Sequence, residues 1–419
     1  MRALVLHPVR HGSDGRDSAA ALAEAVSLTE ALDLDVVGAD LVPLPRVRAG
    51  TLVGTGKLEE IGATVAEREA GLVIVDGILT PVQQRNLEKA WKAKVLDHTG
   101  LILEIFGDRA RTREGVLQVE LAHLSYQKSR LVRSWTHLER QRGGVGFLGG
   151  PGETQIEADR RALDERIVRI KAQLAKVVRT RGQHRAARRR LDYPVVALVG
   201  YTNAGKSTLF NRLTGSEVLA KDMLFATLDP TMRAIELPDG RDAILSDTVG
   251  FISDLPHQLV AAFRATLEEV LDADLVLHVR DIAHEESEAQ AGSVRVTLEE
   301  LGLDEAARER MIEVWNKVDL LPADRAEATR QVAARNPRVR VISARSGEGV
   351  DELLEAIAED LGGPALEEVL RLGFDEGRRR AWLFDHKLVR AERRTDEGFV
   401  VEVRWTERDR ARYEAINAN

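Results

Sequence analysis

The strongest constraint on the fold of this chain is an apolar run that leads directly into a glycine-rich loop. The run covers residues 195–199, and the loop reads GYTNAGKS over residues 200–207. Glycines let backbone N–H groups curl around phosphate oxygens, and the helix after such a loop directs its positive end at the same anion. The pattern therefore predicts a strand, a phosphate-binding loop and a helix in immediate succession.

The residues around this loop predict a doubly wound α/β domain over residues 193–362. Strand-like runs alternate there with stretches of helical spacing, the clearest of which lies between residues 259 and 271. The further strand-like runs are residues 233–237, 243–246, 275–279, 312–315 and 339–342. Strands separated by helices are typical of a largely parallel sheet with helices on both faces.

The loop and the next strand end carry the groups that a nucleoside triphosphate requires. Lys206 supplies a cation for the β- and γ-phosphates, and the Ser207 hydroxyl is a ligand for Mg²⁺, which prefers oxygen. Asp247, in the sequence DTVG, is placed to hold Mg²⁺ through water, and the Gly250 N–H to sense the γ-phosphate. The residues expected to line this part of the nucleotide are Gly200, Tyr201, Thr202, Asn203, Ala204, Gly205, Lys206, Ser207, Thr208 and Phe225.

A further Mg²⁺ ligand is expected from the sequence FATLDPT at residues 225–231, between the helix after the loop and the next strand. We favour Thr227 as this ligand, and Thr231 is the alternative. Such a residue belongs to a first switch segment, which the γ-phosphate and Mg²⁺ order together.

The sequence NKVD at residues 316–319 decides which base the site accepts. Guanine offers two adjacent donors, N1–H and the exocyclic amine, and the Asp319 carboxylate accepts both. Adenine has an acceptor at N1 and no amine at C2, so it would leave Asp319 unpaired and is rejected. The Lys317 stem is expected to cover the base, and the Ala344 N–H to reach the guanine O6. The expected base site comprises Asn316, Lys317, Asp319, Ser343 and Ala344, and it predicts GTP and GDP binding.

Position 251 bears on hydrolysis, because many GTPases carry a glutamine there to orient the attacking water. Here it is Phe251, which neither accepts nor donates a hydrogen bond. The side-chain carbonyl of Asn203 is placed to ligate K⁺ beside the phosphates, where the cation does the work of an arginine finger. The alternative is that Asn203 only hydrogen-bonds the loop. We predict slow hydrolysis, raised by K⁺ or a partner, with Lys206, Asn203 and Gly250 as the catalytic groups.

The remaining chain predicts three further units. Residues 1–108 alternate strand-like and helical runs, with Thr80 and Pro81 opening a helix, so we expect a small α/β domain with a mainly parallel sheet. Residues 109–192 are helical, with a glycine-rich loop at 143–152. Residues 363–419 form a small α+β tail with a strand at 399–405. A stripe at coiled-coil spacing predicts a helical hairpin in the second unit, namely Ile156, Leu163, Ile167, Ile170, Leu174 and Val177.

Charge is distributed unevenly along the chain. Residues 109–190 contain 20 Lys and Arg against 8 Asp and Glu, although the whole chain has a net charge of -8. Arginines at 179, 181, 185 and 188–190 concentrate this charge. Such asymmetry favours a segment that binds a polyanion, because arginine pairs with phosphate without reading sequence. The alternative is a solvated basic helix.

Two negative observations bound the function class. The chain has no cysteine, which excludes disulfides and thiolate metal sites and favours a cytoplasmic protein. No apolar stretch of about 18 residues exists, so we expect no membrane span.

One segment imitates the phosphate loop. Residues 50–57 read GTLVGTGK, but Leu58 stands where Ser or Thr is required. We interpret the segment as a turn before a helix, and a weak second nucleotide site is the alternative.

The combination of motifs resembles the HflX family of ribosome-associated GTPases. The resemblance rests on GPGETQIE at residues 150–157 joined to GYTNAGKS, together with LQVELA at 117–122 and DLPH at 254–257. It covers nearly all of residues 1–362 and weakens in the tail. Met232 is a departure, because the family typically repeats threonine after Thr231.

The resemblance implies an N-terminal α/β domain, a helical linker and a G domain. It also implies binding to the large ribosomal subunit and its rRNA, and in some members splitting of stalled ribosomes. We therefore expect a monomeric GTP-driven switch that uses Mg²⁺. One alternative is an RNA-remodelling protein whose N-terminal domain uses ATP at residues 54–57. The other is a GTPase that assists RNA modification, for which no cofactor motif is visible.

Overall fold

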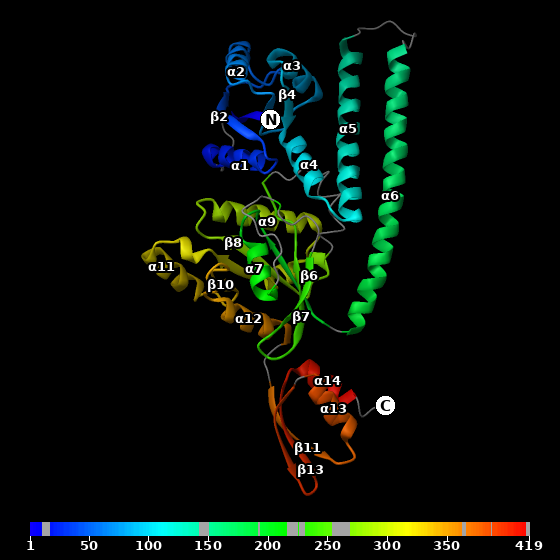
Figure 1. Ribbon diagram of the computed structural model, residues 1–419, viewed down its shortest axis with the longest axis vertical. Helices are drawn as coiled ribbons and strands as arrows, with labels where there is room; N and C mark the ends of the chain where they lie inside the picture. Colours follow the sequence, from blue (N-terminus) through cyan, green and yellow to red (C-terminus); the bar gives the residue numbers. More distant parts are fainter. Residues whose placement is uncertain are drawn as a thin grey trace.

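The computed structural model describes residues 1–10, 17–141, 151–191, 193–215, 225, 231–253, 269–362, 366–386 and 388–415. Three separate sheets organise these residues, and a pair of long helices lies between the first sheet and the second in sequence. Figure 1 shows the first two sheets above one another, the helix pair alongside them, and the third sheet at the far end. None of the described helices has an apolar stretch of the length that a bilayer crossing requires.

The N-terminal domain is a four-stranded parallel sheet in the order β2-β1-β3-β4, as predicted. Thr80 caps α3 through a reciprocal capping box with Gln83, and Pro81 is its first residue. Core residues of α1 and α4 pack on one face of the sheet, and those of α2 and α3 on the other. The elements are β1 (Arg2–Arg10), α1 (Ser18–Glu30), β2 (Asp35–Leu44), α2 (Thr55–Glu67), β3 (Leu72–Val75), α3 (Pro81–Trp91), β4 (Lys94–Asp97) and α4 (His98–Arg109).

The helical hairpin consists of α5 (Arg113–Gln141) and α6 (Pro151–Leu191). Leu163, Ile167, Ile170, Leu174 and Val177 of the predicted stripe pack against Leu117, Leu121 and Leu124 of α5. The predicted loop at 143–152 extends two residues too far, because α6 begins at Pro151. Proline suits the first helical position, where its missing N–H has no partner to lose. Residues 143–150 lie outside the described residues.

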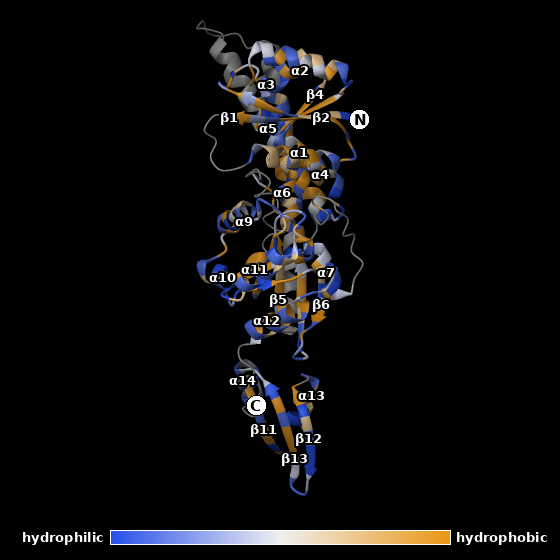
Figure 2. Ribbon diagram, turned by 90° about the vertical axis from the view of Figure 1, so that its left-hand side faces the viewer, coloured by the Kyte–Doolittle hydropathy of each residue, from blue (hydrophilic) through white to orange (hydrophobic). Residues whose placement is uncertain are grey.

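The G domain has a six-stranded sheet in the order β10-β9-β8-β5-β7-β6, in which β6 alone is antiparallel. This confirms the doubly wound α/β prediction, and each strand lies within about two residues of its predicted bounds. Figure 2 shows the apolar residues gathered on the strands between the helices. The elements are β5 (Val195–Gly200), α7 (Lys206–Thr214), β6 (Thr231–Glu236), β7 (Asp242–Asp247), β8 (Leu275–Asp281), α9 (Ser287–Leu301), α10 (Glu305–Arg310), β9 (Ile312–Asn316), η1 (Val318–Leu320), α11 (Ala323–Ala333), β10 (Val339–Val341) and α12 (Val350–Gly362).

The C-terminal unit is a three-stranded antiparallel sheet in the order β11-β13-β12 with two helices. Leu383 and Tyr413 of the helices pack on Val401, Val403 and Trp405 of the central strand. The predicted strand at 399–405 is confirmed. The elements are β11 (Leu366–Gly373), α13 (Gly377–Asp385), β12 (Val389–Thr395), β13 (Gly398–Trp405) and α14 (Glu407–Ala415).

Candidate nucleotide-binding site

The phosphate loop joins the buried strand β5 to α7, as the sequence predicts. Gly200 has φ +152°, and a Cβ there would lie 2.2 Å from the Val279 carbonyl oxygen of β8. Gly205 has φ +92°, and a Cβ there would lie 2.2 Å from Nδ2 of Asn316. Both positions therefore require glycine, because a side chain would meet the neighbouring strand end. The loop backbone is shaped by the elements around it.

Lys206 is buried at the first position of α7. Its Nζ donates to the carbonyl oxygens of Gly200 at 3.1 Å and Tyr201 at 2.8 Å, which holds the amine over the loop. Burial lowers the pKa of Lys206 to about 8, although Asp247 favours the charged form. Bound phosphates would raise this pKa again, since an anion stabilises the ammonium.

Ser207 and Asp247 meet beside this lysine. The Ser207 hydroxyl donates to Oδ2 of Asp247 at 2.8 Å, and Asp247 is fully buried at the end of β7. A hydroxyl and a carboxylate are hard oxygen ligands, and Mg²⁺ in nucleotide sites takes few protein ligands and several waters. The two side chains therefore fit the predicted Mg²⁺ ion. Thr227 lies outside the described residues. Thr231, the alternative, is the first residue of β6.

Gly250 and Phe251 bring the end of β7 against the phosphate loop. The Thr202 N–H donates to the Phe251 carbonyl at 2.7 Å, and the Phe251 N–H donates to the Gly200 carbonyl at 3.0 Å. A Cβ on Gly250 would lie 2.9 Å from Cγ2 of Thr202 and 3.1 Å from Nζ of Lys206. Gly250 is therefore close enough to Lys206 for its N–H to meet a phosphate bound there.

Asn316 connects the phosphate loop to the base site. Its Nδ2 donates to the Ala204 carbonyl at 2.8 Å, and its Oδ1 accepts the Ala344 N–H at 2.9 Å. A guanine O6 that reaches Ala344 would have to share this donor with Asn316. The Ser343 hydroxyl accepts from the Ser346 N–H at 3.0 Å and shapes the same turn.

Lys317 and Asp319 stand at the open end of the site. Nζ of Lys317 forms an ion pair with Oδ2 of Asp281, at the end of β8, at 2.7 Å. Asp319 is exposed in the short helix η1, so its carboxylate is accessible to a base. Asp281 was not predicted, although its position at the end of a parallel strand is the signal that would have identified it.

Three predicted contact residues show features that the sequence did not indicate. Asn203 is exposed and has φ +58°, in the left-handed region. Tyr201 directs its hydroxyl to Ser253 and Glu24. Phe225 packs edge-to-face on Phe106 of α4, with ring centroids 4.7 Å apart. Their contacts with the nucleotide remain predictions, as does that of exposed Thr208.

The segment that imitates the phosphate loop is a turn before a helix, as we interpreted it. Gly54 is the N-cap of α2, and Nζ of Lys57 forms an ion pair with Oε1 of Glu60 at 2.6 Å. Ten residues separate the end of β2 from the start of α2, so the segment does not follow a strand directly. Lys57 is thus engaged by its own helix.

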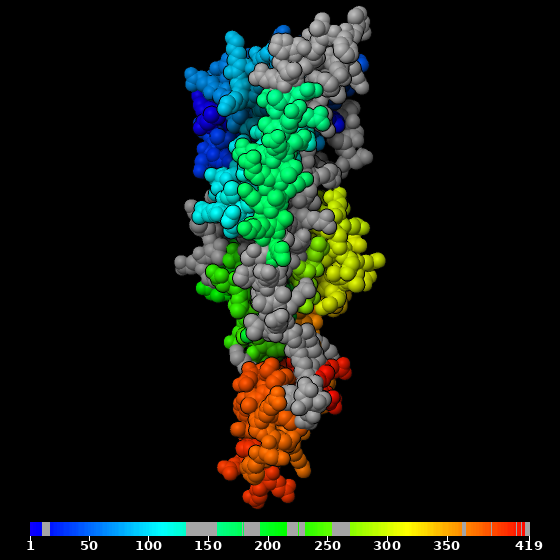
Figure 3. Space-filling model, turned by 90° about the vertical axis from the view of Figure 1, so that its right-hand side faces the viewer, coloured from blue at the N-terminus to red at the C-terminus, as the bar shows by residue number. Residues whose placement is uncertain are grey.

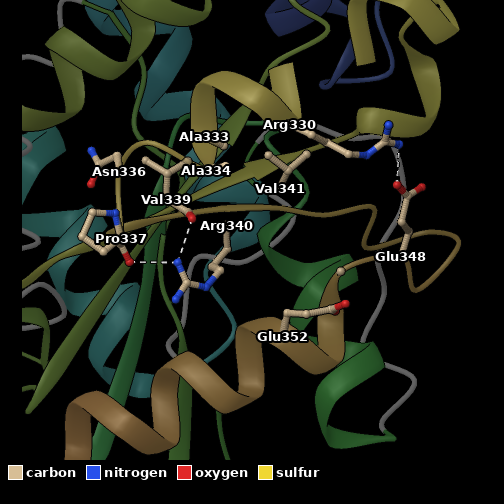
Figure 4. A pocket seen from close by; sticks show the side chains of 11 residues that line it. Arg330, Ala333, Ala334, Asn336, Pro337, Val339, Arg340, Val341, Glu348 and Glu352 are labelled. Carbon is tan, nitrogen blue, oxygen red and sulfur yellow. Dashed lines mark hydrogen bonds and ion pairs between the residues drawn. The ribbon is translucent and has the colours of Figure 1, made fainter. Parts of the chain in front are cut away.

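A pocket of 370 Å³ lies at the outer edge of the G-domain sheet, between α11, β10 and α12 (Figure 4). Its polar side chains are largely engaged with the protein. Arg330 pairs with Glu348 at 2.6 Å, and Arg340 donates to the carbonyls of Pro337 and Val339. Because β10 is separated from β5 by two strands, this pocket is distinct from the nucleotide site.

Comparison with known families agrees with this site. Four family models match successive parts of the chain. They are described as GTP-binding GTPase N-terminal (residues 19–107), GTP-binding GTPase middle region (109–188), 50S ribosome-binding GTPase (195–317) and HflX C-terminal domain (328–415). The last model shows that the resemblance also covers the tail, where the motifs alone were weak.

Individual relatives extend over most of the chain. GTPase HflX of Magnetococcus marinus is 54% identical over 362 residues, which are 86% of this chain and 82% of the relative. GTPase HflX of Escherichia coli is 46% identical over 371 residues, which are 88% and 85% of the two chains. A solved GTP-binding protein from Sulfolobus solfataricus in complex with GDP is 24% identical with a TM-score of 0.44, and covers 86% of this chain and 99% of that one.

The phosphate loop, the NKVD sequence at the end of β9 and the extent of these matches lead to one conclusion: this chain binds guanine nucleotides, hydrolyses GTP and belongs to the HflX family of GTPases.

Proposed function

We propose that GTP binding drives a switch that controls association with the large ribosomal subunit. GTP orders Thr227 around Mg²⁺ and the Gly250 N–H against the γ-phosphate, and hydrolysis releases both, so that the enzyme acts as a timer. Ser207 and Asp247 hold the Mg²⁺ together with Thr227, and Asn203 supplies an oxygen ligand for K⁺. A comparison of turnover in K⁺ and Na⁺ tests the last point, and equal rates would eliminate it.

The helical hairpin is the surface that we assign to rRNA. Its inner stripe is buried between α5 and α6, and an ion pair between Lys128 and Asp164 joins the two helices. Figure 3 shows the described part of α6 on the outside of the molecule. Basic side chains are exposed along it, namely Arg160, Arg161, Arg166, Arg169, Lys171 and Arg179. Such side chains neutralise phosphates without reading sequence.

The observation that carries the proposal is this combination of a guanine-nucleotide site with a basic arm. The description of the family model over residues 195–317, a 50S ribosome-binding GTPase, supports the same partner. We propose in addition that insertion of the hairpin tip into an RNA cavity separates the subunits of stalled ribosomes. Sucrose-gradient analysis of intact ribosomes with the protein and GTP tests this step.

Co-sedimentation with isolated large subunits tests the association. We expect binding with a non-hydrolysable GTP analogue that exceeds binding with GDP and falls steeply with salt concentration. The double variant Arg169→Glu/Lys171→Glu should reduce the salt dependence by about two units of slope, because each phosphate contact contributes about one. The matched control Arg325→Glu/Arg335→Glu reverses two exposed charges in and just after α11. Binding that ignores both nucleotide and salt would refute the proposal.

A further inference from the structure

Tyr201, the second residue of the phosphate loop, links two segments that lie outside the loop. Its ring is buried, with 4% of the residue exposed. Its hydroxyl accepts the Ser253 N–H at 2.8 Å and lies 2.7 Å from the Ser253 hydroxyl. It also donates to the carboxylate of Glu24 in α1 of the N-terminal domain. One hydroxyl thus joins the phosphate loop, the segment after Gly250 and the neighbouring domain.

The backbone around Tyr201 strengthens this connection. Tyr201 forms a parallel bridge with Phe251, and hydrogen bonds on either side connect Phe251 to Gly200 and Thr202. Ser253 follows Gly250 by three residues, so a shift of Gly250 toward a γ-phosphate must change the position of Ser253 relative to the Tyr201 hydroxyl. The hydrogen bond from Tyr201 to Glu24 then either moves α1 or breaks.

Apolar packing surrounds the same contact. Ala25 and Leu28 of α1 belong to one continuous core with Tyr201, Phe251 and Ile252 of the G domain. Figure 1 shows α1 and α4 on the side of the N-terminal domain that faces the G domain. Close-packed cores of this kind respond to small displacements by changing between discrete arrangements. The hydrogen bond between Tyr201 and Glu24 therefore lies in an interface whose packing changes in response to small displacements.

We infer that the Tyr201 hydroxyl couples the state of the nucleotide to the placement of α1 against the G domain. Tyr201 acts here as a positioning residue through Ser253 and Glu24. A phenol–carboxylate hydrogen bond is strong, so its loss changes how firmly α1 is held against the G domain. A nucleotide state that displaces Ser253 therefore shifts the equilibrium between the bonded and unbonded placements of α1, and the free energy of this bond sets the size of the coupling. The inference rests on the GTPase switch and is independent of ribosome association.

Hydrogen exchange of α1 in the full chain tests this inference, with GDP and with a non-hydrolysable GTP analogue, in the absence of ribosomes. We expect a difference in exchange between the two nucleotides in the wild type. In Tyr201→Phe and Glu24→Ala this difference should fall by about fivefold or more, the lower end of typical allosteric couplings. Combining the two substitutions should add nothing, because they remove the same bond.

Two control variants separate coupling from a general loss of structure. Glu24→Gln keeps an oxygen that can accept from Tyr201 and should retain the nucleotide-dependent difference. Glu30→Ala removes an exposed carboxylate from the same helix and should behave as the wild type. The inference is overturned if the wild type shows no difference, or if Tyr201→Phe retains it in full. GDP affinity measured on each variant shows whether the nucleotide site itself has failed.

Discussion

One parallel and one largely parallel sheet, each covered by helices, offer similar settings for a ligand but differ in the loop that follows their strands. In the G domain, β5 runs directly into glycines whose conformation leaves room for backbone N–H groups, and Lys206 lies over the loop. In the N-terminal domain, the similar sequence at 50–57 caps a helix, and Lys57 pairs with Glu60. A sheet edge therefore becomes a phosphate site when a strand end, glycines and a lysine that is not paired within its own helix coincide.

The N-terminal sheet uses its own carboxyl edge for a different purpose. Asp76 accepts from Nδ1 of His7 at 2.7 Å and of His98 at 2.8 Å, and Asp97 is bonded by Tyr126 and Arg130 of α5. Polar groups here hold the sheet and the hairpin together. The same edge that binds a ligand in one sheet thus anchors the arm in the other.

Replacing each of the two lysines by alanine gives the largest expected difference in GTP turnover. Lys206→Ala should lower GTP turnover by about 1,000-fold, since a preorganised charge on the phosphates is lost. Lys57→Ala should change turnover by less than about twofold, because that lysine only stabilises its own helix turn. Steady-state GTPase assays on both variants make the measurement. A comparable loss in Lys57→Ala would show that the N-terminal loop takes part in nucleotide binding.

Asp319→Asn should give the next largest effect. The amide no longer accepts both guanine donors, so GTP affinity should fall by about 100-fold or more. Xanthine carries a carbonyl where guanine has an amine, and the asparagine can donate to it. Competition between xanthosine and guanosine triphosphates measures the change, and undiminished guanine preference would mean that another group selects the base.

Asp76→Asn should affect stability of the N-terminal sheet and leave GTP affinity unchanged. Burial tends to raise the pKa of Asp76, but hydrogen bonds from His7 and His98 outweigh it and leave the pKa well below its usual range. The ionised Asp76 carboxylate therefore stabilises the fold fully at a pH above its pKa in the unfolded chain, which is near 3.8. This stabilisation is lost as the pH falls through the lower pKa of the folded protein.

Hydrogen exchange of β1 and β3 at pH 7, corrected for intrinsic rates, tests this variant. We expect the free energy of local opening to fall by about 1–3 kcal/mol. Asp40→Asn, an exposed position on β2, is the control. Unchanged protection in Asp76→Asn would show that the histidine pairs contribute nothing.

The lowered pKa of Lys206 predicts the smallest effect, a dependence of nucleotide affinity on pH. Because that pKa is about 8, nucleotide binding above pH 8 should take up a proton, and affinity should fall by up to tenfold per pH unit. Calorimetry in buffers of different ionisation enthalpy measures the uptake. Binding without proton uptake at pH 9 would contradict the lowered pKa of the Lys206 amine.

Most of the nucleotide site was predictable because its motifs are local. The phosphate loop, Asp247 and Asp319 each follow a strand that the apolar pattern identifies, and parallel strands bring their carboxyl ends together. The start of α6 at Pro151 shows the limit of this reasoning, since glycine content indicated a longer loop.

Contacts between domains could not be predicted in the same way. Glu24 and Phe106 lie in the N-terminal domain, and nothing in their local sequence indicates that they meet Tyr201 and Phe225. Such pairs depend on how folded units pack.

Displacement of labelled GDP from the full chain tests the central claim most directly, namely that one site around Lys206 and Asp319 selects guanine. We predict that GTP displaces the label at concentrations at least about 100-fold lower than ATP does. Equal displacement by ATP and GTP would contradict the assignment of the base to Asp319.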